Sequence, residues 1–120
     1  NSRKDKHLFH DFNVNLPGTG IVRGIEVRLD GRADSTSGVP RFCVQLSWNG
    51  GTTWTVAKST VTLSTIEQTF VLGGAADSWG HAWLTNDLAN ANFRVRIINI
   101  AGSTARDFSL DWVAVRVTYQ

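Results

Sequence analysis

Two tryptophans four residues apart, Trp79 and Trp83, come nearest to forming a ligand-binding site by their type and spacing. If this segment is extended, both indole rings point to one side, because alternate residues of a strand share a face. Flat aromatic rings stack on the C–H faces of sugars, and the neighbouring His81 and Asp77 would hydrogen-bond the hydroxyls. The pattern predicts a carbohydrate-binding surface of Asp77, Trp79, His81 and Trp83. The alternative is that the indoles close the end of a folded core.

The remaining reactive side chains predict no catalytic site. The chain contains no nucleophile elbow, phosphate-binding loop, CxxC or HExxH motif, so we expect a protein that is not an enzyme and has no cofactor. His7 and His10, three residues apart, fall on opposite faces of a strand and would not share a metal ion there. Asp30 and Asp34, with loop carbonyls, give only a weak signal for structural calcium. The single Cys43 excludes an internal disulfide and is expected to be a small buried residue.

The most specific string in the chain is SWNGGTTW, from Ser47 to Trp54. It resembles the Asp-box, the hairpin motif of sialidase propellers, with Asn49 where that motif usually has Asp. Asn tolerates left-handed dihedral angles and bonds turn amides, while glycine accepts a positive φ. The resemblance implies a structural hairpin made by Ser47, Asn49, Gly51, Thr53 and Trp54. A single copy does not build a propeller, whose blades repeat the motif.

Period-two alternation of apolar and polar residues determines the predicted fold. It is clearest from Ile21 to Gly31 and from Arg41 to Trp48, and turn signals separate the runs. We predict one all-β domain over residues 1–120, an antiparallel two-sheet β-sandwich of jelly-roll or Ig-like type. It would have six to eight strands and at most one short helical turn, capped by Thr85 or Asn86. Residues 1–6 would be flexible or would contact a partner.

Near the end of the chain the apolar phase reverses. Phe108, Leu110 and Trp112 alternate with polar residues, and the apolar positions then shift by one to Val113 and Val115. This reversal predicts a β-bulge or a strand that is apolar on both faces. We expect Trp112, like Trp48, to lie in the core because each is in phase with apolar neighbours.

The charged residues exclude some classes of partner. The chain has 12 basic and 10 acidic residues, and a net charge of +2 is too small to predict nucleic-acid binding. No apolar stretch reaches the roughly 18 residues that a membrane span needs. The chain starts at Asn1 and contains no Met, which favours a processed, exported protein at the cell surface or outside the cell. On one polar face, Glu26, Arg28, Asp30 and Arg32 are expected to meet Arg94, Arg96 or Arg116 across strands.

Four segments carry a wider resemblance. They read GIEVRLD (24–30), VQLSWNGGTTW (44–54), NFRVR (92–96) and LDWVAVRV (110–117). As a set they resemble β-sandwich modules of large exported bacterial surface proteins and of phage structural proteins, over about residues 9–119. The resemblance implies surface display and brings neither catalytic residues nor a ligand.

Modules of that kind usually have a further strand before the segment that corresponds to Leu8–Val14, and here the sequence begins almost directly at that segment, so we expect a sandwich that is short of one strand, with either the N-terminal or the C-terminal segment as the donor. A sandwich short of one strand leaves an unpaired edge, which is a template for a strand donated by a neighbour. Head-to-tail donation does not close and would build a filament. The residues expected at such an assembly contact are Leu8, Phe9, Phe12, Val115, Val117 and Tyr119.

Two functions therefore remain open. The first is a non-catalytic structural or adhesive module that binds itself or other surface proteins. The second is a carbohydrate-binding module of a secreted multidomain protein, with a polysaccharide as its partner.

Overall fold

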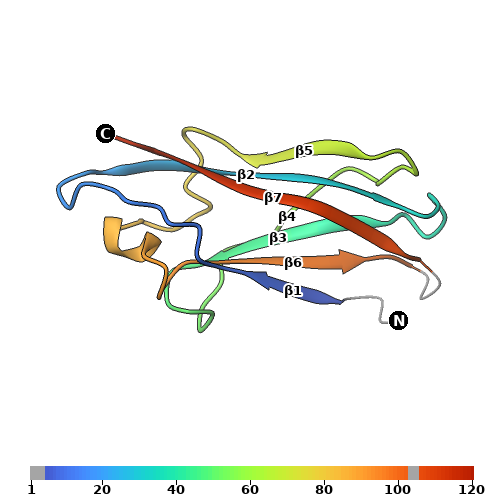
Figure 1. Ribbon diagram of the computed structural model, residues 1–120, viewed down its shortest axis with the longest axis horizontal. Coiled ribbons are helices and arrows are strands. Elements are labelled where there is room, and N and C mark those ends of the chain that lie inside the picture. The colour runs from blue at the N-terminus through green and yellow to red at the C-terminus, as the bar shows by residue number, and fades with distance from the viewer. Residues whose placement is uncertain (1–4, 103–105) are drawn as a thin grey trace.

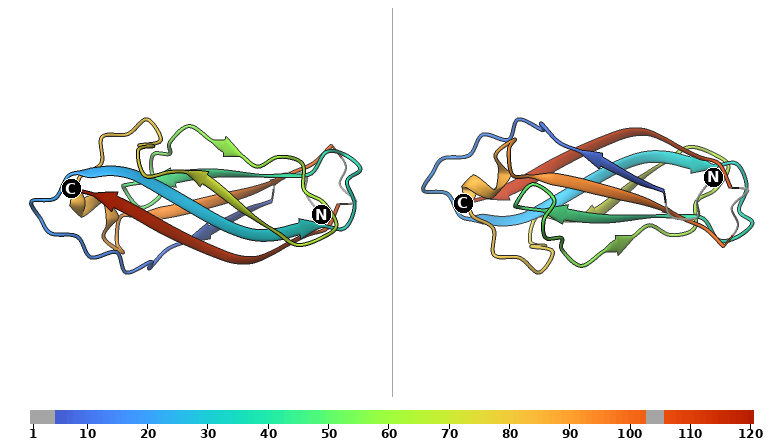
Figure 2. Two further views of the ribbon diagram at one scale, coloured as in Figure 1. Left: turned by 90° about the horizontal axis from the view of Figure 1, so that it is seen from above. Right: turned by 90° about the horizontal axis from the view of Figure 1, so that it is seen from below.

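A computed structural model describes residues 5–102 and 106–120 as two antiparallel β-sheets packed face to face (Figures 1 and 2). Sheet A has the strand order β1-β6-β3-β4, and sheet B has the order β5-β2-β7. The predicted all-β, two-sheet sandwich is confirmed. The seven strands among the described residues are β1 (Lys6–Phe9), β2 (Val22–Ala33), β3 (Arg41–Ser47), β4 (Lys58–Ser59), β5 (Gln68–Gly73), β6 (Arg94–Ile100) and β7 (Phe108–Tyr119).

The core lies between the sheets and consists of the apolar residues that alternate in the sequence. In β2, the central strand of sheet B, Ile25, Val27 and Leu29 are fully buried. They face sheet A because successive side chains of a strand point to opposite faces. Sheet A contributes Phe42, Val44, Leu46, Val95 and Ile97, all fully buried.

A β-bulge in β7 explains the reversal of its apolar phase. Asp30 lies opposite Trp112, whereas the next residue, Gly31, lies opposite Leu110, so Asp111 is an extra residue in β7. One extra residue moves the following side chains to the other face. The predicted bulge is confirmed.

The same bulge shows that one core prediction was wrong. The side chain of Trp112 is 57% exposed, because the bulge directs it to the outer face of sheet B. Trp48, the other tryptophan predicted in the core, is partly buried and packs against the core residues.

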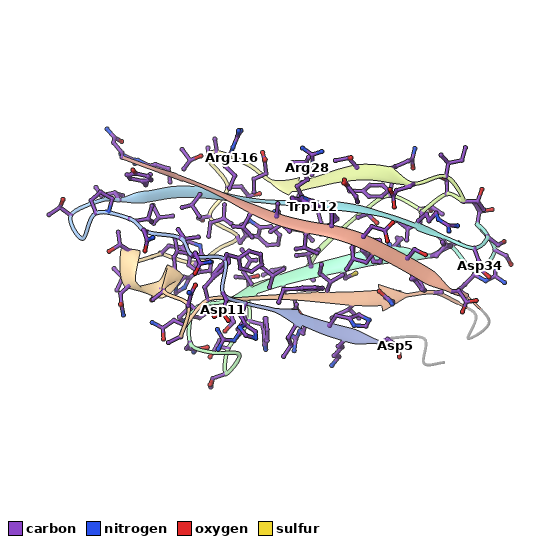
Figure 3. The ribbon with its side chains drawn as sticks, viewed as in Figure 1. Asp5, Asp11, Arg28, Asp34, Trp112 and Arg116 are labelled. Carbon is purple, nitrogen blue, oxygen red and sulfur yellow. The ribbon has the colours of Figure 1, made fainter. Side chains whose placement is uncertain are left out.

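The polar outer face of sheet B matches the predicted charge ladder only in part. Glu26 of β2 lies opposite Arg116 of β7, as expected. Arg94 and Arg96 belong to β6 in sheet A, so their expected pairing with the β2 charges is wrong. Figure 3 shows Arg28 and Arg116 along the same part of sheet B.

One short 3₁₀ turn, η1 (Thr85–Leu88), is the helical element of the described residues, as predicted. Its expected cap at Thr85 or Asn86 is wrong, because Asp87 Oδ2 accepts a 2.9 Å hydrogen bond from the Leu84 N–H. In the part of the chain that the structure describes, no helix is long and apolar enough to cross a membrane.

The molecule is elongated, with extents of 47 × 25 × 22 Å. Asp5, the first described residue, and Gln120 lie toward opposite ends of the long axis (Figures 1 and 3). Of the segment 1–6 that was expected to be flexible, residues 1–4 lie outside the described residues, and Lys6 begins β1.

Candidate functional site

The two indoles of the predicted sugar-binding surface are buried. Trp79 is 3% exposed and Trp83 is 6% exposed. The indole N–H of Trp79 donates to the Ile25 carbonyl, and that of Trp83 donates to the Ser78 carbonyl, each at 2.7 Å. The prediction of an exposed sugar-binding surface is therefore wrong. A buried indole needs a hydrogen-bond acceptor for its N–H, and here backbone carbonyls supply it. Both rings belong to the core.

The two polar members of that predicted surface bond to residues of the same chain. His81 stacks on Trp48, with ring centroids 3.7 Å apart and planes 13° apart, and its Nε2 lies 3.2 Å from Asp87 Oδ2. Asp77 forms a 2.7 Å ion pair with Lys58 Nζ and accepts a 2.9 Å bond from the Trp79 N–H. The hydrogen bond from Lys58 and that from the Trp79 backbone hold the pKa of Asp77 below its ordinary value. These bonds fix the loop to the sandwich.

The Asp-box-like string forms a compact hydrogen-bonded loop. Asn49 Oδ1 accepts bonds from the Thr53 N–H at 2.8 Å and from the Ser47 hydroxyl at 3.0 Å. The Ser47 hydroxyl oxygen in turn accepts from the Gly51 N–H at 2.9 Å. Gly51 has a φ of +96°, in the left-handed region that favours glycine. Trp54 covers the guanidinium of Arg96, whose carbon lies 4.0 Å from the ring centroid.

The carboxylates of the weak calcium prediction have separate partners. Asp30 Oδ1 accepts a 2.7 Å bond from the Thr69 hydroxyl. Asp34 Oδ1 accepts from the Asp107 N–H at 3.1 Å and lies 3.5 Å from Arg106 Nη1. Over residues 5–102 and 106–120, no group of three or more His, Cys, Asp or Glu side chains has the arrangement of a metal site.

The most conspicuous unfilled feature of the sandwich is the outer edge of β7. This 12-residue strand pairs with β2 on one side, and no described strand pairs with its other side. Ile21 and Gln120 exchange two backbone hydrogen bonds of 2.9 and 2.8 Å. The bonding direction alternates along a strand, so Val117, Val115 and Val113 direct their backbone groups away from β2. Within residues 5–102 and 106–120, these backbone donors and acceptors have no strand partner on this edge.

Incomplete burial marks the same flank of the core. The inward-facing side chains of β7 are only partly buried, whereas those of the central strand β2 are fully buried. In Figure 1, β7 crosses at the front of the molecule with β6 and β1 below it, and both views of Figure 2 show β7 and β1 along the same long side of the molecule. We call this open side the seam. The partly buried side chains of β7 along the seam are Phe108, Leu110, Val113, Val115 and Val117.

The N-terminal segment forms the other border of the seam. Strand β1 pairs with β6 over four residues, and its Leu8 is exposed on the outer face. Phe9 and Phe12 pack against the core, Phe12 with its ring edge against Phe93 at 5.8 Å. Figure 3 shows Asp5 and Asp11 along this border, with Trp112 on β7 above them.

The six residues predicted at an assembly contact are therefore distributed along both borders of the seam. Val115 and Val117 face their own core, and Tyr119 is 47% exposed. Leu8, Phe9 and Phe12 belong to the opposite border.

A cavity of about 250 Å³ opens on the seam, between β1, β6 and β7. Its lining includes Asn99, a residue that the sequence analysis missed. The available signal was a polar residue in phase with Val95 and Ile97 on the apolar face of β6. The remaining lining residues are His7, Phe9, Phe108 and Leu110.

Comparisons with known proteins found no matching family model, no matching curated protein and no matching solved structure. The function proposed below is therefore argued from the unpaired edge of β7 and the partly buried side chains along the seam.

Proposed function

We propose that this chain is a non-catalytic structural module that associates with its own kind by accepting a donated β-strand at the free edge of β7. The single observation that carries the proposal is this 12-residue edge, unpaired among the described residues along one side. Long edge strands invite pairing with another chain unless charge, proline or a bulge blunts them. Beyond the bulge at Asp111, the stretch Trp112–Tyr119 has no proline and one charged residue, Arg116.

The incomplete burial of the β7 side chains supports the same proposal. A strand added beside β7 becomes the fourth strand of sheet B. It covers apolar side chains that are now partly exposed, and each square ångström of apolar surface removed from water contributes about 25 cal/mol. Main-chain hydrogen bonds give such complexes affinity, and side-chain pockets give them specificity.

The donor is the N-terminal segment, residues 5–16, of a neighbouring copy. Its pairing within its own sandwich is limited to the four residues of β1, and only one of these, Phe9, is partly buried. By contrast, β7 pairs with β2 from Phe108 to Tyr119 and is an integral part of its own sheet. Beyond β1, the segment is held by Phe12, Val14 and Leu16 against the core and by two hydrogen bonds between Asn13 and Asn90. It has no strand pairing there, and an element without ladder pairing detaches at lower cost than one paired along its whole length, which favours the N-terminal segment over β7.

Donation from one copy to the next is a head-to-tail contact, which generates an open filament. The two described ends of the chain lie toward opposite ends of the long axis, along which the molecule extends 47 Å, and this suits an end-to-end arrangement. Because the chain resembles exported surface modules, we place this assembly outside the cell or on its surface.

The test is analytical ultracentrifugation and negative-stain electron microscopy of the full chain over a range of concentrations. The proposal expects oligomers or filaments that an excess of a peptide of residues 5–16 converts to capped monomers. A scrambled peptide of the same composition should leave the assemblies intact. Monomers at every concentration, or assemblies that ignore the peptide, would contradict the proposal.

One observation favours the second candidate, polysaccharide binding, at a new position. A cavity of about 470 Å³ lies between the segment before β2 and η1. Side-chain amides line it, and amides pair well with vicinal hydroxyls of a neutral sugar. Glycan-array binding that Asn86→Ala abolishes would support this function, and array silence would remove it. The polar lining residues are Asn13, Asn15, Thr85, Asn86 and Asn90.

A further inference from the structure

The outer face of sheet B carries an exposed tryptophan. The side chain of Trp112 is 57% exposed, whereas the other tryptophans of the chain are buried or partly buried. Ala114, two residues further along β7, lies on the same face and presents only a methyl group. Figure 3 shows Trp112 and Arg28 along the same part of sheet B. Because exposed aromatic rings are enriched in protein interfaces, this face is a candidate contact surface.

The charged residues of β2 on the same face alternate in sign. In chain order this charge series is Glu26, Arg28, Asp30 and Arg32. These residues share the outer face because Val27 and Leu29, which lie between them, are fully buried on the inner face. The ion pair between Arg28 and Asp30 is long, with 3.9 Å between Nε and Oδ1, and the Arg28 side chain is 54% exposed. The guanidinium of Arg28 is therefore accessible to a carboxylate of another molecule.

The charge series matches itself when it is reversed. A second copy can lie face to face with its strands antiparallel, related by a two-fold axis midway between Arg28 and Asp30. Arg28 then lies over Asp30 of the other copy, and Glu26 lies over Arg32 of the other copy, so every charge of the series meets an opposite one. Parallel strands in the same register would instead place each charge over a like charge, which is unfavourable. The charge pattern thus fits a second copy of this chain in the antiparallel orientation.

The side chains of β7 match in size under the same rotation. Trp112 lies opposite Asp30 and Ala114 lies opposite Arg28, so the rotation that places Asp30 over Arg28 also places Trp112 over Ala114. Sheets that pack face to face are about 10 Å apart, and a large ring above a small side chain fills that space. A two-fold contact repeats this fit, because each copy supplies one indole and one methyl group.

We propose that two copies of this chain pair through the outer faces of sheet B, with Arg28 on Asp30 and Trp112 on Ala114 of the other copy. The contact uses the face of the sheet and leaves the edge of β7 free, so it is independent of strand addition. Exposed ion pairs contribute little each, and association costs translational and rotational freedom. We therefore expect a weak contact, with monomers at micromolar and pairs at millimolar concentration. Copies that strand addition has gathered make many such contacts at once, which joins assemblies side by side.

Dilution followed by NMR tests the contact on Val117→Pro, in which proline removes an N–H that a donated strand would bond. Between micromolar and millimolar protein, the indole N–H of Trp112 and the amides of Asp30 and Ala114 should shift, while the amides of sheet A stay constant. The original chain with an excess of the peptide of residues 5–16 gives the same test without a substitution in β7. Shifts that are absent over this range, or that lie mainly outside the face, would overturn the proposal whether or not strand addition occurs.

A charge exchange tests the orientation. Arg28→Asp places like charges together at the centre of the contact and should weaken association about tenfold. Arg28→Asp combined with Asp30→Arg restores opposite charges across the two-fold axis and should recover the association. Circular dichroism checks that both variants are folded. A combined variant that associates as weakly as Arg28→Asp would contradict the antiparallel pairing.

The other occupant that suits an exposed indole is a sugar, and cellohexaose is the probe for it. Added to dilute protein, cellohexaose should leave the indole N–H of Trp112 unshifted. A shift with cellohexaose, together with none on concentrating the protein, would assign the face to a sugar and overturn the proposal.

Discussion

The indole N–H of Trp79 donates a 2.7 Å hydrogen bond to the backbone carbonyl of Ile25, which joins the loop after β5 to the centre of sheet B. Gly73, with a φ of +79°, permits this approach: a Cβ there would lie 2.6 Å from Trp79 Nε1 and 2.2 Å from the Ile25 oxygen. The Trp79 indole thus makes a structural hydrogen bond and does not form an exposed surface for a ligand.

Replacing Trp79 by phenylalanine should lower the free energy of unfolding by about 1–3 kcal/mol, because the smaller ring leaves space in the core and the Ile25 carbonyl keeps only the 3.2 Å bond from the Gly74 N–H. Urea denaturation monitored by circular dichroism measures the change. The matched control is Trp112→Phe, whose side chain is exposed and whose replacement should cost no more than about 0.5 kcal/mol. Equal losses for the two variants would contradict the assignment of Trp79 to the core.

The Asp-box-like loop provides a second prediction. Asn49→Ala removes the acceptor of the Thr53 N–H and should destabilise the protein by roughly 0.5–2 kcal/mol, as the loss of a capping side chain does. Asn49→Asp keeps that acceptor, and the Thr53 hydroxyl can then donate to the carboxylate, so its effect should be close to zero. Thermal unfolding of both variants checks the contrast. An equal loss in Asn49→Asp would show that the amide nitrogen, and not the oxygen, holds the loop.

Periodicity predicted the sandwich because each sheet faces the core on one side, which imposes alternation on strands such as β2 and β3. It also located the bulge in β7, since one extra residue reverses the apolar phase. Periodicity does not predict the hydrogen-bond partner of each polar group. The Trp79 and Trp83 N–H groups bond to carbonyls of Ile25 and Ser78, and that pairing exists only in the folded chain.

Asn99 is a second residue whose role periodicity could not predict. A polar residue in apolar phase was visible in the sequence, but its significance depends on an unpaired oxygen and an adjacent cavity. Trp112 was placed in the core because its phase was read from the residues before it, while Asp111 had already shifted the register.

The Lys58–Asp77 ion pair should make stability depend on pH in the acid range. The folded-state pKa of Asp77 lies below its ordinary value of 3.8, chiefly through the hydrogen bond from Lys58. The ionised Asp77 carboxylate therefore adds to the free energy of unfolding at pH values above its unfolded-state pKa. This stabilisation disappears as the pH falls through the folded-state pKa. Asp77→Asn should lower the Tm at pH 7 by more than at pH 3. Because both side chains are about one-third exposed, at 33% and 36%, added salt should shrink the difference at pH 7. A Tm difference that is constant from pH 7 to pH 3 would contradict the role of the charge.

Asn99→Leu should stabilise the isolated sandwich by about 1–3 kcal/mol, because it removes a buried oxygen that lacks a donor. The cavity beside Asn99 gives the larger side chain room. Asn15→Leu, at an exposed position, is the control and should change stability little. Equilibrium unfolding at a concentration where the chain is monomeric gives the values. Destabilisation by Asn99→Leu would mean that the amide is already satisfied within the monomer.

The measurement that tests strand addition at β7 most directly is sedimentation velocity of Val117→Pro beside Val117→Ala. The Val117 N–H points away from β2, and proline is tolerated where an edge strand directs its N–H to solvent. Val117→Ala also loses side-chain contacts but keeps the N–H, so it controls for packing. We predict that Val117→Pro folds with an unchanged circular dichroism spectrum and stays monomeric, while Val117→Ala assembles like the original chain. A folded Val117→Pro that assembles as readily as the original chain would contradict strand addition at this edge.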